Sequence, residues 1–266
     1  MAAAAGARID PAFALAFGAL VGLAWAALWL WSGSPYGAYL DHGSWMRPGL
    51  VGDLCRTLPG GGAALHALLY GAGWLLMCVA MMLPTTAPVL AAWGRLTARR
   101  ADRALLLALV VAGYLAAWAA FGLLAHAFDA ALRALAPRSP WLAVNGWAVG
   151  AAALGLAGLF QFSALKHRCL DGCRSPLAFA LDAWQRPRPR LQAWRLGLRH
   201  GAYCVGCCWA LMLLMFVVGM ASLGAMLLLA AAMAAEKNLP GGRRLAAPLG
   251  VLLLAAGACV AAMHLG

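Results

Sequence analysis

The stretch from residue 203 to residue 235 constrains this chain most, because it is apolar throughout. As one α-helix it would be about 50 Å long, whereas the hydrocarbon core of a bilayer is about 30 Å thick. Two structures remain open, a single steeply tilted helix and a hairpin that folds back near residues 219–224. Both need a lipid or fully buried environment, since a helix that is apolar all round has no face for water.

The composition extends this conclusion to the whole chain. Of the 266 residues, 65% are hydrophobic and 11% are charged, whereas soluble proteins average about 45–50% and about 25%. Other apolar runs cover about 12–31, 64–83, 104–127, 141–162 and 245–264. We therefore expect one transmembrane domain over residues 1–266. The expected fold is all-α, a polytopic transmembrane helical bundle of about seven spans, or six if 203–235 is one long helix.

The basic residues predict how the bundle is oriented. With seven spans and a cytoplasmic N-terminus, 16 of the 20 Lys and Arg residues lie inside. They occupy the N-terminal segment and the loops at 95–103, 163–201 and 237–244. Outside remain Arg47, Arg56, Arg133 and Arg138. A single helix at 203–235 would move the 237–244 loop outside, so the positive-inside rule favours the hairpin.

This orientation predicts a multi-pass protein of the bacterial inner (cytoplasmic) membrane, with the lipid bilayer as its first partner. The longest polar segment, residues 163–201, is expected to be a cytoplasmic basic loop with short interfacial helices. The net charge of +12 is explained as a topology signal, so no nucleic acid is expected as a partner. The oligomeric state is not indicated.

Cysteines gather at the predicted cytoplasmic end of the 203–235 stretch. In YCVGCCWALM (203–212), Cys204, Cys207 and Cys208 have the i, i+3, i+4 spacing of one helix face. Met212 extends this face by one turn beyond Cys208. Three thiols on one face are typical of metal or redox chemistry rather than of packing alone.

Two other segments bring sulfur to the same side. CLDGC contains a second cysteine pair at i, i+4, and the second span ends in WLLMCVAMMLP with two adjacent methionines. Nearby histidines and one acid at a helix end are auxiliary candidates. The expected ligands are therefore Cys169, Cys173, Cys204, Cys207, Cys208, Met81, Met82, Met212, His167, His200 and Glu236.

The ligand types favour copper. Thiolates and thioethers together select Cu(I), whereas thiolates alone also suit zinc and iron–sulfur clusters, so zinc and iron stay as alternatives. Purely structural explanations stand beside this one. The Met81–Met82 pair alone is typical core filler, and Glu236 can reach the interface and pair with Lys237 or an arginine. Near the outer ends, His66 and His126 with Asp129 fit interfacial packing better than a second metal site.

Several motifs resemble a bacterial domain-of-unknown-function family of predicted metal-binding integral membrane proteins. The resemblance rests on MMLP, FQFSALKHRCLDGCRSP, YCVGCCWALM and the Gly-Met and Glu-Lys pairs at 219–220 and 236–237, and it covers about 70–240. It implies an inner-membrane protein with a metal site, and it implies no reaction. Where this family pattern has Asn after Gly-Met, the chain has Ala221-Ser222.

We therefore predict copper handling or delivery through a Cys/Met site at the cytoplasmic membrane face, with a membrane copper enzyme or a metallochaperone as partner. No phosphate loop, dinucleotide fingerprint, nucleophile elbow or HExxH motif indicates catalysis. One alternative is a membrane redox enzyme, either a dithiol/quinone oxidoreductase or a copper-dependent oxygenase, although a reducing cytoplasm disfavours stable disulfides. The other is a metal transporter with broken helices at 84–88 and 219–224.

Overall fold

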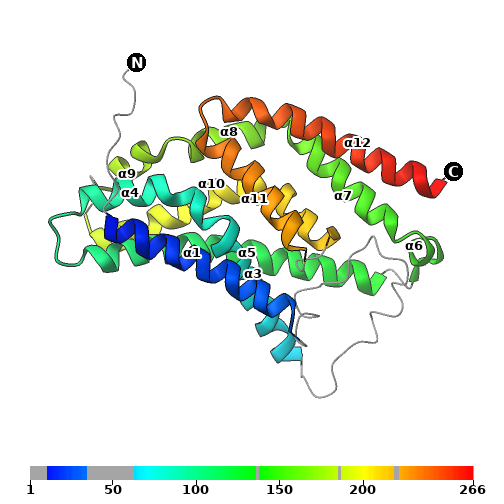
Figure 1. The fold of residues 1–266 in the computed structure, drawn as a ribbon, viewed down its shortest axis with the longest axis horizontal. Coiled ribbons are helices and arrows are strands. Elements are labelled where there is room, and N and C mark those ends of the chain that lie inside the picture. The colour runs from blue at the N-terminus through cyan, green and yellow to red at the C-terminus, as the bar shows by residue number, and fades with distance from the viewer. Residues whose placement is uncertain (1–10, 35–62, 136–137, 185–186, 219–221, 266) are drawn as a thin grey trace.

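A computed structural model describes residues 11–34, 63–135, 138–184, 187–218 and 222–265. Within these residues the secondary structure is entirely helical, which confirms the all-α prediction (Figure 1). Arg8, Arg47, Arg56, Cys55 and the Gly-Met pair at 219–220 lie outside the described residues.

Long helices form the body of the bundle. They are α1 (Pro11–Ser32), α3 (Ala63–Met81), α5 (Arg103–Leu135), α7 (Trp147–Phe160), α10 (Pro189–Val218), α11 (Leu223–Asn238) and α12 (Ala246–Leu265). Shorter helical elements lie between the long helices along the chain. These are η2 (Leu83–Thr86), α4 (Ala87–Leu96), α6 (Pro140–Val144), α8 (Ala164–Cys173), α9 (Pro176–Trp184) and η4 (Gly242–Leu245).

The length and hydropathy of the helices indicate how many membrane spans the described residues can form. Four helical segments, in α1, α5, α10 and η4–α12, are long and apolar enough to cross a bilayer. Two bent pairs raise this to six if each is one span: α3 with η2–α4, bent by 49°, and α7 with α8, bent by 66°. Pro84 sits in the first bend, where a helix break was predicted. Within the described ranges, the remaining long apolar helix is α11, whose 16 residues fall short of the ~20 that a full crossing needs.

The 203–235 stretch forms a hairpin rather than one helix. Helix α10 ends at Val218, and α11 begins at Leu223 and runs back, so that Lys237 contacts Cys204 near the middle of α10. Helix α10 begins at Pro189, well before the expected start at residue 203. Only α8 and α9 of the 163–201 segment are therefore short helices. Residues 189–201 instead extend the long helix, because Ala193, Leu196 and their neighbours bury one face.

Two helix pairs pack with backbone in contact because glycines lie at their crossings. Between α5 and α10, a Cβ on Gly197 would collide with the carbonyl oxygen of Val110, and one on Gly113 with that of Trp194. Between α7 and α12, a Cβ on Gly158 would lie 2.9 Å from the carbonyl oxygen of Gly250. Such small-residue contacts are how membrane helices approach closely. The first pair fixes α10 against α5 and so positions the thiols of α10.

Candidate metal centre

The two predicted cysteine groups meet inside the bundle. After the bend that follows α7, the Ser163 hydroxyl caps α8 by accepting a hydrogen bond from the backbone N–H of Lys166, at 3.1 Å. Helix α8 then runs along α10 and ends at Cys173, whose Sγ lies 3.8 Å from Sγ of Cys207. The Cys207 and Cys208 sulfurs are 3.3 Å apart. The sequence placed these thiols on the same side of the bilayer, and the fold brings them into contact.

Glycines in both cysteine motifs allow this contact between α8 and α10. A Cβ on Gly172, within CLDGC, would lie 2.6 Å from the ring of Tyr203. A Cβ on Gly206, within VGCC, would lie 2.5 Å from Sγ of Cys169. The half-buried Cys169 therefore sits directly against the backbone of α10. Both glycines are therefore needed for the close contact between α8 and α10, because a larger side chain at either position would separate the helices.

Cys204 has a different environment from the other thiols. Its sulfur lies 2.9 Å from Nζ of Lys237 on α11 and 3.0 Å from the hydroxyl of Tyr114 on α5. The same ammonium lies 3.3 Å from Oγ1 of Thr85 and 4.0 Å from Sδ of Met82. The Tyr114 hydroxyl also donates to the carbonyl oxygen of Met82, at 3.1 Å. A buried positive charge this close to a thiol stabilises its thiolate form.

A buried ion pair anchors the end of α11 beside these thiols. The ammonium of Lys166 lies 2.7 Å from Oε2 of Glu236, and both side chains are almost fully buried. Arg174 donates to the carbonyl oxygens of Glu236, at 2.6 Å, and Leu239, at 2.9 Å. Glu236 therefore pairs with Lys166, not with Lys237 or an arginine side chain as the sequence suggested. Lys237 is left to face Cys204.

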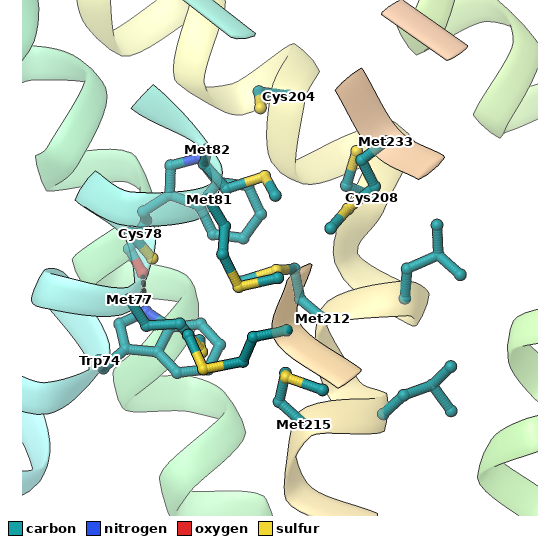
Figure 2. Close-up of a cluster of buried hydrophobic side chains, with 14 of the residues drawn as sticks. Trp74, Met77, Cys78, Met81, Met82, Cys204, Cys208, Met212, Met215 and Met233 are labelled. Carbon is teal, nitrogen blue, oxygen red and sulfur yellow. Dashed lines mark hydrogen bonds between the residues drawn. The ribbon is translucent and has the colours of Figure 1, made fainter. Parts of the chain in front are cut away.

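Thioethers continue inward from the thiols. Met81 at the end of α3, Met82 directly after it and Met212 on α10 are at most 1% exposed. Figure 2 shows Met81 and Met212 extending toward each other from their two helices, with Met82 on the side of Cys204. The predicted methionine ligands thus line the same interior as the thiols.

The predicted histidines are close in sequence but make no hydrogen bond to a cluster sulfur within the described residues. The ring of buried His200 packs against Tyr114 and Phe179, both with centroids 5.9 Å away. Its Nδ1, like that of His167, is buried without a hydrogen-bond partner among the described residues. Near the opposite end, the His126 ring packs on Tyr70, with centroids 4.0 Å apart, and the His66 side chain lies outside the described residues.

Sequence reasoning missed several residues at this centre. Lys237 and Tyr114 gave no local signal, because only the folded bundle brings them to Cys204. Met215 was detectable, since it lies three residues after Met212 on the same face of α10. Across the described part of the chain, no three His, Cys, Asp or Glu side chains are arranged as a preformed metal site. The thiols form pair contacts instead, so a third ligand has to come from a methionine or from a side-chain movement.

Comparison with known protein families gives one decisive match. Residues 71–260 match the PpoB2 family, which is described as a copper chaperone. The chain belongs to the PpoB2 family. The matched range contains all the candidate ligands. This membership confirms that the protein functions in copper handling, and it puts a copper-related family in place of the resemblance to a family of unknown function. No curated protein and no solved structure matches the chain.

Proposed function

We propose that this PpoB2 protein is an integral membrane copper chaperone that holds Cu(I) as cargo in a buried Cys/Met site at the cytoplasmic membrane face. One observation carries the proposal. Cys173 of α8 contacts Cys207 of α10 across 34 residues of sequence, and Cys207 contacts Cys208. All three thiols are buried or nearly so. Sulfur atoms brought together from separate segments and shielded from water are the ligand set that a soft cation needs.

The ligand chemistry favours Cu(I) over the other metals considered. Thiolates alone suit zinc and iron–sulfur clusters as well, but the addition of thioethers favours Cu(I). Met82, whose Sδ is near the Lys237 ammonium that contacts Cys204, supplies such a thioether. Cu(I) accepts few ligands, so a contacting thiol pair with one thioether is a sufficient set.

Lys237 supplies the charge balance for this site. Each cysteine that binds a metal loses its proton, so Cu(I) held by two thiolates carries a net negative charge. A lone charge in a low-dielectric interior costs several kcal/mol. The ammonium 2.9 Å from Cys204 offsets this charge and lowers the cost of loading.

The position in the membrane follows from the long apolar helices and from charge. Four long apolar helical segments and two bent pairs support integration into a bilayer. The basic residues of α8, the 95–103 segment and η4 favour placing the thiol end at the cytoplasmic face of a bacterial inner membrane. A membrane copper enzyme or a soluble metallochaperone would exchange copper with the protein there.

Metal analysis of the full chain tests the proposal. The protein is purified anaerobically after growth with copper, and its metals are measured by mass spectrometry. We expect stoichiometric copper in the wild type and in Cys259→Ser, whose thiol is exposed on α12. We expect the copper to be lost in Cys207→Ser/Cys208→Ser. An unchanged copper content in the double variant contradicts the proposal.

The contact between Cys173 and Cys207 also supports a second candidate, dithiol redox exchange. Both are free thiols in the structure, 3.8 Å apart, and a disulfide requires a sulfur–sulfur bond of about 2.05 Å. This candidate predicts a reversible disulfide between them, seen as an alkylation mass shift under oxidising and reducing conditions. No shift under either condition excludes it.

A further inference from the structure

Sulfur-containing side chains from three helices form one buried column that runs from Cys208 along α10, away from Cys204. We term it the sulfur ladder, and its members are Met77 and Met81 on α3, Cys208, Met212 and Met215 on α10, and Met233 on α11. Figure 2 shows Met233 next to Cys208, Met81 and Met212 extending toward each other, and Met77 and Met215 one level deeper.

Helical spacing explains why the column is continuous. Cys204, Cys208, Met212 and Met215 follow one another at intervals of four, four and three residues, so they form one stripe on α10. Met77 and Met81 repeat the four-residue interval on α3. From Cys204 to Met215 the stripe rises about 16 Å, about half the thickness of the hydrocarbon core.

Methionine is concentrated in this part of the buried core. Seven of the chain's 11 methionines belong to the same buried cluster. Leucine has nearly the same volume and better-defined rotamers, and methionine is the poorer choice for a uniquely packed core. The ladder members are at most 1% exposed, so water does not compete for these sulfurs.

We propose that the deep part of the ladder is a second Cu(I) site, made of the thioethers of Met77, Met81, Met212 and Met215, and that Cys208 connects it to the thiol site. This inference rests on the proposed function, because it takes Cu(I) as the cargo. Thioethers are soft, neutral ligands that select Cu(I) over zinc. A cation bound there keeps its positive charge and therefore binds more weakly than at the thiolates.

An aromatic ring next to the deep site could interact favourably with the positive charge of Cu(I) held by neutral thioethers. Trp74 lies one turn before Met77 on α3, and its Nε1 donates to the carbonyl oxygen of Trp118, at 2.9 Å. This hydrogen bond fixes the indole in the buried cluster that contains the ladder. The face of an indole attracts cations more strongly than that of any other side-chain ring.

Transfer between the two sites is a ligand exchange without redox chemistry. The bond from copper to the Cys208 thiolate breaks, a bond from copper to a methionine thioether forms, and Cys208 takes up a proton from solvent. Copper remains Cu(I) throughout, so no electron acceptor or donor is required. The reverse exchange returns copper to the thiols and releases that proton.

Titration of the full-length protein with Cu(I), read out against a competing Cu(I) chelator, tests the second site. The wild type is expected to bind one tight equivalent and a second, weaker equivalent that fills only in excess Cu(I). Met81→Leu/Met212→Leu is expected to lose the weaker equivalent and to keep the tight one, because the thiol site takes its thioether from Met82. The matched control is Met263→Leu, whose side chain is 67% exposed on α12 and should leave both equivalents unchanged.

The outcomes separate this inference from the proposed function. If the double methionine variant binds both equivalents with wild-type affinity, or if the wild type binds only one, the ladder is packing and the inference is wrong. If the wild type binds no copper at all, the proposed function itself fails. Methionine-to-leucine exchange nearly conserves side-chain volume, so both methionine variants should stay folded. Thermal unfolding of each variant checks this.

Discussion

Helices α10 and α12 are both long and apolar, yet they differ in what surrounds them. In the most hydrophobic part of each span, 67% of α10 residues are buried inside the protein against 22% of α12 residues. Both carry cysteine, but Cys207 contacts two other thiols, whereas Cys259 is exposed. An apolar helix therefore does not by itself bring a thiol into contact with other thiols. What matters is that other helices bring further sulfur atoms to it.

The largest expected effect comes from breaking the buried ion pair that joins α8 to α11, between Lys166 and Glu236. Lys166→Met leaves Glu236 as an unpaired buried charge, which typically destabilises a protein by about 3–5 kcal/mol. Chemical unfolding in detergent measures the free energy of unfolding. Copper retention should fall as well, because Glu236 precedes Lys237. The double variant Lys166→Met/Glu236→Gln should recover much of the stability, and a single variant as stable as this double one would contradict the prediction.

Glycines at the α5–α10 and α7–α12 crossings allow a test of which helix pair matters for copper binding. Gly197→Ala on α10 and Gly158→Ala on α7 both place a Cβ against backbone of the opposite helix, so each should lower stability by about 1–3 kcal/mol. Only Gly197→Ala should also weaken copper binding, since it displaces the helix that carries the thiols. Gly155→Ala, with no atom within 4 Å of the new Cβ, is the control. Equal copper loss in Gly158→Ala would show that the α7–α12 pair also shapes the site.

A smaller effect is expected from removing the buried ammonium. Lys237→Met leaves the copper–thiolate complex without its counter-charge, so Cu(I) affinity should fall about tenfold, which corresponds to about 1.4 kcal/mol. Lys237→Arg should keep most of the affinity because it keeps the charge. Arg244→Met, at an exposed cation on η4, is the control. Competition with a Cu(I) chelator measures the affinities, and tighter binding in Lys237→Met would mean that the ammonium competes with copper.

Local spacing was enough to predict much of the fold and part of the site. Apolar runs predicted the helices, and the excess length of 203–235 together with the positive-inside rule predicted the hairpin. The i, i+3, i+4 spacing placed Cys204, Cys207 and Cys208 on one face. The early start of α10 was also visible in principle, because Ala193, Leu196, Gly197 and His200 repeat at helical intervals among the basic residues.

The rest depended on tertiary contacts that no local pattern records. Lys237 stands next to Glu236, so an ion pair with Glu236 was a natural sequence-based expectation for it. The fold instead pairs Glu236 with Lys166, 70 residues away, and turns Lys237 toward Cys204. In the same way, Tyr114 reaches Cys204 from α5, and Thr85 reaches the Lys237 ammonium from η2. These contacts depend on which helices pack next to α10, and the packing of the whole bundle sets that arrangement.

X-ray absorption at the copper edge of the Cu(I)-loaded, full-length protein tests most directly whether the thiols of α8 and α10 bind the same ion. The account predicts a shell of sulfur atoms alone at about 2.3 Å, typical of thiolate bonds to a metal of this kind. Cys173→Ser should remove one sulfur from that shell, and Cys259→Ser should remove none. A shell dominated by nitrogen or oxygen, or one that Cys173→Ser leaves unchanged, would contradict it.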